Sequence, residues 1–322
     1  MRLVALAAFT ISWLLLSGCI GEEQNKKPGQ SPEVTPYRTA SESPQAKQPD
    51  KPKETVPDAK PGLKIYFIDV GFGDSTLIVS DGHAILFDAG NDSSSPAIRK
   101  MLTAAGVQKL DVLALSSNAP EHTGSARAIS VYYLVETVWH NGVNYSNAAY
   151  RDALSVPGAK QVAVEYGDIF DFGKGKITIL NPQKSRYLLS SGPDSIAMKV
   201  EYGDFCALLF SDSEGGAASG SDAGTVAGGL DAKITSGPVG IACQVIKVGN
   251  HGSGNSASFQ LLERAKPQIA IISVGPNKDA RLPANALIER LKLKGISVLR
   301  TDEVGSVWLS TAGNGYEIYS DR

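Results

Sequence analysis

The sequence predicts an α/β protein with an αββα sandwich, in which two β-sheets pack face to face and helices cover their outer sides. Two observations favour this fold. Short apolar runs separated by turn residues dominate residues 63–139 and again residues 168–299, so each half of the chain supplies a sheet. Helical patterns lie between these strands, where they would cover the sheets from outside.

In the first half, strands are expected where apolar residues run between glycine-containing turns. These strands are residues 63–70, 75–79, 84–87, 112–115 and 135–139. A helix is expected over residues 95–105, because Pro96 suits its first turn and Gly106 suits the position after its end. A second helix is expected near residues 147–154.

The second half repeats this pattern. Residues 196–202 and 205–210 predict a hairpin around Gly203-Asp204. The other expected strands are residues 168–172, 176–180, 245–248, 269–273 and 297–299. Helices are expected over residues 259–265 and 284–293, between the later strands.

Residues 215–240 do not fit the pattern, because they are rich in glycine, alanine and serine and longer than an ordinary connection. We expect a disordered insertion, since this composition buries little apolar surface. The alternative is a segment that lies over a functional site, because it directly follows Asp212.

The N-terminus is typical of a lipoprotein signal peptide over residues 1–19. Arg2 precedes an apolar core from Leu3 to Leu16, and Leu16-Ser17-Gly18-Cys19 matches a lipobox. Cys19 is then the first mature residue and the lipidation site. An uncleaved membrane anchor is the alternative, although the apolar run is short for a bilayer span.

Residues 20–62 are predicted to form a disordered, proline-rich tether between this anchor and the domain at residues 63–322. The expected localisation is therefore extracytoplasmic, with the protein held on a membrane through lipidated Cys19. Cys206 and Cys243 are the other cysteines. We expect two small buried apolar side chains, with a disulfide as the alternative outside the cytoplasm.

The chain carries 31 Lys and Arg residues against 33 Asp and Glu residues, which argues against a strongly basic nucleic-acid-binding face. A local basic patch is still compatible with this balance. The oligomeric state is left open.

An ordered series of motifs runs through residues 63–318. The segments are FIDVGFGDS at 67–75, LFDAG at 86–90, SNAPEHTG at 117–124, FSDSE at 210–214, VIKVGNHGS at 245–253, SVGPN at 273–277 and RTD at 300–302. The series resembles the metallo-hydrolase domain of ComEC-type competence proteins, in the metallo-β-lactamase superfamily. That family usually writes the first segment F-I-D-V-G-Q-G-D-S and the fifth V-L-K-V-G-H-H-G-S. The resemblance implies a metallo-β-lactamase-type αββα sandwich with a metal site at one edge.

The resemblance also implies that the metal motif is degenerate. The family's His-x-His-x-Asp-His falls on the loop at residues 117–122, where Ser117 and Ala119 replace two histidines. Glu121 replaces the aspartate and His122 is retained. The surviving donors are Glu121, His122, Asp212 and His251, which could hold one divalent ion, Zn or Mn.

Roles within this site follow from the same resemblance. Asp212 and His251 are the expected catalytic residues. Asp69, Asp88 and Asn250 are expected to orient the metal ligands without binding the metal themselves. Asp74 is expected to shape the turn after Gly73. His83 is expected to face solvent.

Three alternatives remain for the chemistry: a metal-free pseudoenzyme, a one-metal site, and an unusual active two-metal site. The function that the resemblance implies is therefore a hydrolase of the phosphodiesterase or nuclease class, with lost or reduced activity. The alternative is a non-catalytic surface protein, either a binding protein or an accessory partner of a DNA-uptake or envelope complex. A nucleic acid or another phosphodiester is the expected ligand.

Overall fold

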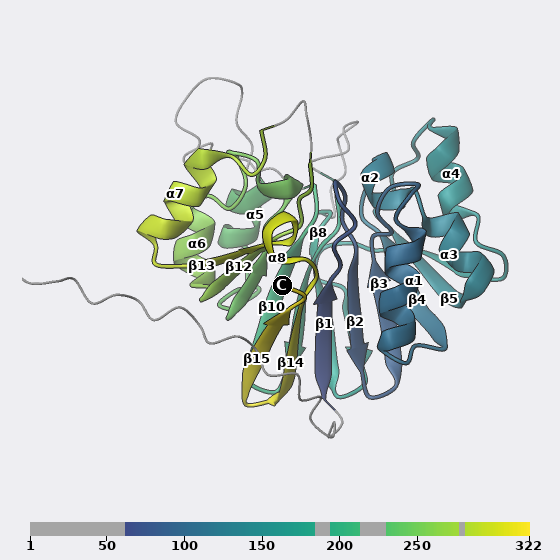
Figure 1. Ribbon diagram of the computed structural model, residues 1–322, viewed down its shortest axis with the longest axis horizontal. Helices are drawn as coiled ribbons and strands as arrows, with labels where there is room; N and C mark the ends of the chain where they lie inside the picture. Colours follow the sequence, from purple (N-terminus) through teal and green to yellow (C-terminus); the bar gives the residue numbers. More distant parts are fainter. Residues whose placement is uncertain (1–61, 184–193, 213–229, 277–280) are drawn as a thin grey trace, which may run out of the picture. The chain divides into compact units, whose positions relative to one another are not determined.

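The computed structural model describes residues 62–183, 194–212, 230–276 and 281–322, and two layers of sheet form its centre (Figure 1). Within the described residues the first sheet has eight strands and the second has seven. The order of the first sheet is β15 (Gly315–Ser320), β14 (Val307–Gly313), β1 (Leu63–Phe67), β2 (Thr76–Ser80), β3 (His83–Phe87), β4 (Lys109–Leu115), β5 (Leu134–His140) and β6 (Lys160–Ala163). The order of the second is β13 (Ser297–Arg300), β12 (Ile269–Ile272), β11 (Val245–Lys247), β10 (Phe205–Phe210), β9 (Ala197–Tyr202), β8 (Gly175–Asn181) and β7 (Ile169–Phe172).

Side-chain alternation explains how the sheets pack. In β1, Leu63, Ile65 and Phe67 are fully buried, whereas Lys64 and Tyr66 between them are partly exposed. The buried set packs against Met198, Leu209 and other apolar residues of the second sheet, so the main core lies between the two sheets. Because strand side chains alternate between faces, this pattern leaves the opposite face of each sheet for helices.

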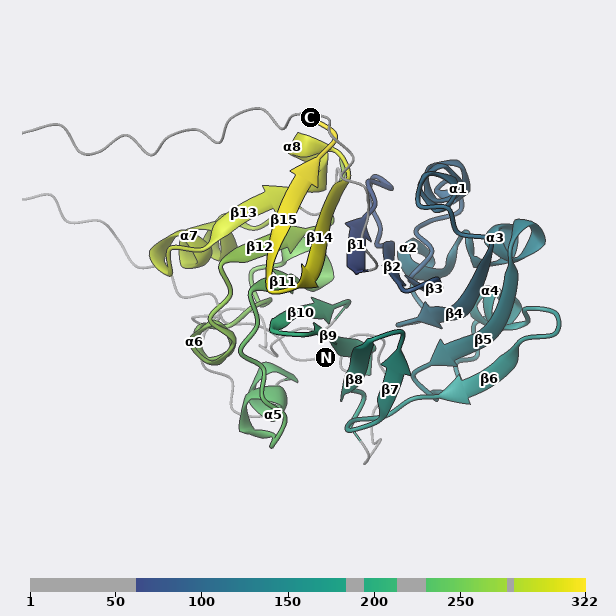
Figure 2. The same ribbon diagram turned by 90° about the horizontal axis from the view of Figure 1, so that it is seen from below.

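Helices cover both outer faces, as Figure 2 shows. The first sheet carries α1 (Ser95–Ala104), α3 (Ala126–Tyr132) and α4 (Ala148–Leu154), and the second carries α5 (Leu230–Ser236), α6 (Phe259–Ala265) and α7 (Asn285–Leu293). In α1, Ile98 and Leu102 are four residues apart and both fully buried. The predicted αββα sandwich is confirmed. None of the described helices is both long and apolar enough to cross a bilayer.

Several expectations need correction. The C-terminal hairpin of β14 and β15, the edge strand β6 and the short helix α8 (Thr301–Val304) were not predicted. The expectation of disorder over residues 215–240 is wrong for α5, because Leu230 and Ile234 bury against the second sheet. Residues 215–229 of that predicted insertion lie outside the described residues, as do the predicted signal peptide and almost all of the predicted tether.

The two cysteines are joined. Cys206 in β10 and Cys243 before β11 form a disulfide, with their Cα atoms 4.9 Å apart. The bond connects neighbouring parallel strands of the second sheet. The alternative of a disulfide is therefore the one realised, since both side chains share the layer beneath α5 and α6.

The topology brings polar loops to one edge of the sandwich. Strands β3, β4 and β5 are parallel to one another, and so are β10, β11, β12 and β13. Functional residues in open α/β sheets gather beyond the carboxyl ends of parallel strands. The loops that leave these ends carry Asp88, His122, Asp212 and His251.

Candidate metal centre

Two histidines and three aspartates meet beyond the strand ends. Asp74 lies between β1 and β2, and Asp88 directly follows β3. His122 belongs to the short helix α2 (Pro120–Thr123) after β4. Asp212 follows β10, and His251 lies in the 3-10 turn η1 (Asn250–Gly252) after β11. All five residues are at most 9% exposed, so their charges must be satisfied by one another or by a ligand.

His122 is held by carboxylates on both sides. Its Nδ1 lies 2.9 Å from Oδ2 of Asp88, and its Nε2 lies 2.9 Å from Oδ1 of Asp212. Burial opposes the charged ring, but the carboxylates of Asp212 and Asp88 outweigh it and raise the pKa of His122 well above its usual value. These contacts favour the charged ring, which can donate to both carboxylates.

Asp88 is fixed in turn by three donors. It accepts hydrogen bonds from the backbone amide of Ser116, from the Ser116 hydroxyl and from the Ser211 hydroxyl, all between 2.8 and 2.9 Å. A carboxylate held in this way fixes the orientation of the histidine that it binds. The expectation that Asp88 orients a ligand agrees with these contacts.

His251 presents a free nitrogen. Its Nδ1 donates to the carbonyl oxygen of Ser273 at 3.0 Å, which leaves Nε2 as the atom with a lone pair. Nε2 is buried and has no hydrogen-bond partner among the described residues. The backbone around this ring is strained, because both Asn250 and His251 adopt left-handed conformations, with φ of 47° and 48°. Strain of this kind gathers at functional sites.

The four predicted ligands come together. Single ligand atoms of Glu121, His122 and His251 lie within 4.8 Å of one another, and Asp212 joins this group through its hydrogen bond to His122. The orphaned Nε2 of His251 and the Asp88-bound ring of His122 fit a divalent metal ion, because histidine ligands are held through their other nitrogen. The His122 proton would have to leave first, so binding competes with protons.

The neighbouring position lacks donors. The Ser117 hydroxyl donates to Oδ2 of Asp212 at 3.2 Å, and it also accepts from the Ala119 amide at 3.3 Å. Ala119 offers no side-chain donor. The loop that would supply two more imidazoles thus supplies one neutral oxygen, which is already hydrogen-bonded.

Asp69 and Asn250 also have defined contacts. Asp69 accepts from the Gly71 amide and pairs with Arg322 at 3.4 Å, so it stabilises the turn after β1. Its expected role in orienting a ligand stays a prediction. Asn250 donates its backbone amide to the Ser211 carbonyl at 2.8 Å, which ties η1 to the strand that carries Asp212. His83 is half exposed, as expected.

Sequence reasoning missed Lys247 and misjudged Asp74. The Lys247 ammonium lies 2.7 Å from Oδ2 of Asp74, and both side chains are 1% exposed. The available signal was a lysine inside the apolar run Val245–Val248, since a buried ammonium needs a partner. Asp74 is a part of the site and does more than shape a turn. Burial favours its neutral form, but Lys247, His251 and His122 together lower the pKa of Asp74.

The buried charges of the centre favour a cation. Asp74, Asp88, Asp212 and the partly buried Glu121 face Lys247 and His122, so carboxylates outnumber cationic groups. A divalent ion bound in place of the His122 proton would reduce this negative excess.

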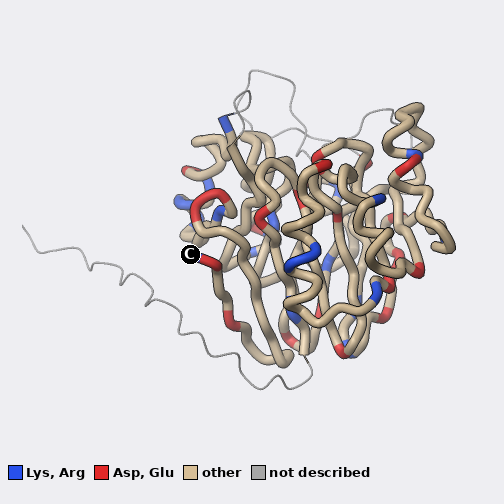
Figure 3. The backbone as a smooth tube through the Cα atoms, turned by 45° about the vertical axis from the view of Figure 1, so that its right-hand side comes forward, with Lys and Arg blue, Asp and Glu red and all other residues tan. Residues whose placement is uncertain are grey.

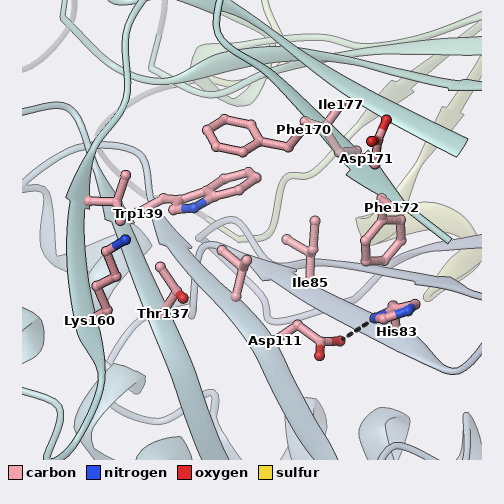
Figure 4. Close-up of a pocket in the computed structure, with 12 residues that line it drawn as sticks. His83, Ile85, Asp111, Thr137, Trp139, Lys160, Phe170, Asp171, Phe172 and Ile177 are labelled. Carbon is pink, nitrogen blue, oxygen red and sulfur yellow. Dashed lines mark ion pairs between the residues drawn. The ribbon is translucent and has the colours of Figure 1, made fainter.

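A separate cavity of about 270 Å³ lies between the sheets (Figure 4). Its walls include Trp139, Phe170 and Phe172, and His83 and Asp111 mark its rim. Both rim residues lie at the starts of β3 and β4, whereas the metal centre lies beyond the ends of those strands. The cavity is therefore distinct from the centre. Figure 3 shows acidic and basic residues interspersed along the backbone.

Comparisons with known proteins agree with the motifs. The chain is 27% identical to "Competence protein ComA" of Neisseria gonorrhoeae, over 81% of the chain and 34% of that protein. It is 25% identical to "ComE operon protein 3" of Bacillus subtilis, over 76% of the chain and 32% of that protein. It is 26% identical to "Recombination protein 2" of Haemophilus influenzae, over 82% of the chain and 31% of that protein.

These relatives confirm the predicted resemblance to ComEC-type proteins, and the chain spans about a third of their length. No protein-family model matches the chain. Among solved structures, the metallo-β-lactamase fold protein YhfI of Bacillus subtilis is 11% identical with a TM-score of 0.48, covering 76% of this chain and 98% of that one. The diiron β-hydroxylase CmlA of Streptomyces venezuelae is 12% identical with a TM-score of 0.48, covering 79% and 54%.

Proposed function

We propose that this chain, which is similar to ComEC-type competence proteins over about four fifths of its length, is a hydrolase-fold protein with a single-metal centre and at most slow phosphodiesterase activity. One observation carries the proposal. His251 directs an unpartnered, buried Nε2 into the site, while its Nδ1 is fixed by the Ser273 carbonyl. That tautomer is the one a metal ion requires of a histidine.

The ion would be held by His122, His251, Asp212 and Glu121, a set of nitrogen and oxygen donors that suits Zn or Mn. When bound, such an ion lowers the pKa of a water molecule and polarises a phosphoryl oxygen. The protein's own residues prepare the site for it. Asp88 and the Ser273 carbonyl hold the two rings.

Slow turnover follows from the absence of ligands for a second metal ion. In two-metal phosphodiesterases, a pair of ions stabilises both the attacking and the leaving oxygen. Ser117 supplies only a neutral hydroxyl and Ala119 supplies no ligand for a second ion. A phosphodiester, including a nucleic acid strand, is the proposed substrate class.

The proposed location is the outer side of a membrane, with lipid on Cys19 and residues 20–62 as a spacer. The Cys206–Cys243 disulfide supports this location independently, because disulfides persist mainly in oxidising compartments. A role as a partner in an envelope complex is compatible with this location.

Metal content and turnover of the purified full chain test the proposal. The protein is stripped with chelator, loaded with Zn or Mn, and analysed for metal per chain and for cleavage of bis(p-nitrophenyl) phosphate. One ion per chain, lost in His251→Ala and kept in the matched exposed variant His83→Ala, supports the proposal. Two ions with rapid turnover would overturn it. Absence of binding in every condition would favour the non-catalytic binding protein.

A further inference from the structure

Asp74 lies in a turn, but the turn alone does not account for the position of its carboxylate beside both histidines of the metal centre. Its Oδ2 lies 3.8 Å from Nδ1 of His122, and its Oδ1 lies 3.8 Å from Nδ1 of His251. These two rings belong to opposite halves of the sandwich, and their centroids are 5.6 Å apart. One carboxylate therefore lies near the Nδ1 atoms of both histidine rings.

The backbone of Asp74 reaches a third member of the centre. Its amide donates to the Glu121 carbonyl at 3.0 Å, and its carbonyl accepts from the Gly90 amide at 2.8 Å. The loop that carries Glu121 and His122 is thus attached to the same residue. Gly73 allows this close approach, because a Cβ there would lie 2.7 Å from the Glu121 carbonyl oxygen.

Lys247 fixes the carboxylate. Its ammonium donates to Oδ2 of Asp74 at 2.7 Å and to the backbone carbonyl of Phe210 at 3.0 Å. Phe210 is the last residue of β10, the strand that Asp212 follows. The other oxygen, Oδ1, is buried with no hydrogen-bond partner among the described residues. A buried carboxylate oxygen without a donor is costly, so its place near His251 Nδ1 calls for a reason other than turn geometry.

We propose that Asp74, held by Lys247, is a positioning residue that sets the spacing and orientation of the two histidine ligands. The inference rests on the proposed single-metal centre. The anion stabilises positive charge on both rings as they bind a cation, and the Lys247 contact keeps the carboxylate itself from becoming a ligand. Partners of this kind behind metal ligands affect metal affinity by about 10- to 100-fold.

The variants separate positioning from plain stability. Asp74→Asn keeps the size and the backbone contacts but leaves Lys247 buried without a counter-charge, so it loses both stability and metal affinity. The double variant Asp74→Asn/Lys247→Met removes both charges, and replacing a buried pair by neutral groups is often tolerated. We expect the double variant to regain thermal stability while its metal affinity stays about 10-fold or more below that of the wild type.

Asp111→Asn is the matched control. Asp111 also pairs with a lysine, at 3.1 Å from Lys109 Nζ, and also faces a histidine, at 3.5 Å from His83 Nδ1. It lies at the opposite end of the strands. This variant should leave metal affinity unchanged and shift only the ring ¹⁵N signals of His83.

Two readouts are taken on the full chain: affinity for Mn or Zn by titration, and the ring ¹⁵N chemical shifts of the four histidines in the metal-free protein. The expected result is that both Asp74 variants shift the His122 and His251 signals and lower the affinity. Wild-type signals and affinity in the double variant would overturn the inference. If the wild type binds no metal, the single-metal function fails, and the ring signals alone still decide the role of Asp74.

Discussion

The hydroxyl of Ser117 lies 3.2 Å from Oδ2 of Asp212, in the loop where the ComEC-type motif carries a histidine. Asp212 is one of the four donors that the motif retains. A neutral hydroxyl therefore occupies a position beside Asp212 where the motif carries an imidazole. Under the proposed function, this replacement and Ala119 are what limit the centre to one ion.

Restoring both histidines should restore the second ion. Ser117→His/Ala119→His adds two imidazoles beside Asp212, and we expect two ions per chain and a rise in phosphodiester turnover of about 100-fold or more, because the second ion stabilises the other displaced oxygen. Elemental analysis and bis(p-nitrophenyl) phosphate cleavage measure this. Ser117→Ala is the control and should stay at one ion. A double variant that still holds one ion would show that the two missing histidines do not set the limit.

Asp88→Asn should weaken both the fold and the centre. Asp88 accepts hydrogen bonds from the amide and the hydroxyl of Ser116, from Ser211 and from His122. Asparagine carries no negative charge and has only one acceptor oxygen, so some of these buried donors would lose their acceptor. We expect the free energy of unfolding to fall by about 3 kcal/mol, as for other broken buried ion pairs. Metal affinity should fall about 10- to 100-fold. Urea unfolding and metal titration test this, and an unchanged affinity would contradict the orienting role.

Stability of the metal-free protein should depend on the protonation of His122. Burial disfavours the charged ring, but Asp212 and Asp88 raise the pKa of His122 in the folded state. A raised folded pKa stabilises the fold fully below the unfolded value of about 6.5, and this contribution is lost as pH rises through the folded value. We therefore expect the free energy of unfolding to fall as pH increases above about 6.5. His122→Asn should flatten this dependence and His83→Asn should not. Urea unfolding in chelator at several pH values measures it.

The sequence predicted the sandwich because burial patterns are local. β1, β10 and α6 follow alternating, continuous and helical apolar patterns that tertiary contacts reinforce. The hairpin of β14 and β15 was missed because its apolar residues are interrupted by serine, glycine and glutamate. Helix α5 was missed because only Leu230 and Ile234 distinguish it from its glycine-rich surroundings.

The candidate site was predictable in part. Glu121, His122, Asp212 and His251 were identified because they match motif positions, and the structure brings them together. The role of Asp74 was not identified, because it depends on Lys247, which lies 173 residues away in the sequence. Asp69 also matches a motif position, and its side chain accepts a hydrogen bond from Gly71. Long-range pairing of buried charges is not encoded in local spacing.

Lipid attachment at Cys19 remains a prediction from the lipobox. Cys19→Ser should abolish it, because the thiol is the only lipid-accepting group of that motif. We expect the variant to leave the membrane fraction and its mature mass to lack acyl chains, measured by cell fractionation and intact-mass analysis. Ser17→Ala is the matched control, which keeps the cysteine. An unchanged distribution and mass in Cys19→Ser would exclude the lipoprotein.

Loss of the Cys206–Cys243 disulfide should weaken the second sheet and, with it, the centre. The bond closes a sequence separation of 37 residues that includes Asp212. Cross-links of this kind stabilise small domains by about 2–4 kcal/mol, chiefly by restricting the unfolded chain. We expect Cys206→Ser/Cys243→Ser to lower the free energy of unfolding by about that amount, and wild-type protein in reductant to match it. Metal affinity should fall less than in Asp88→Asn, because Asp212 keeps its hydrogen bonds to His122 and Ser117. Urea unfolding with and without dithiothreitol measures the effect, and a wild-type protein that reductant does not destabilise would show that the thiols are unpaired in solution.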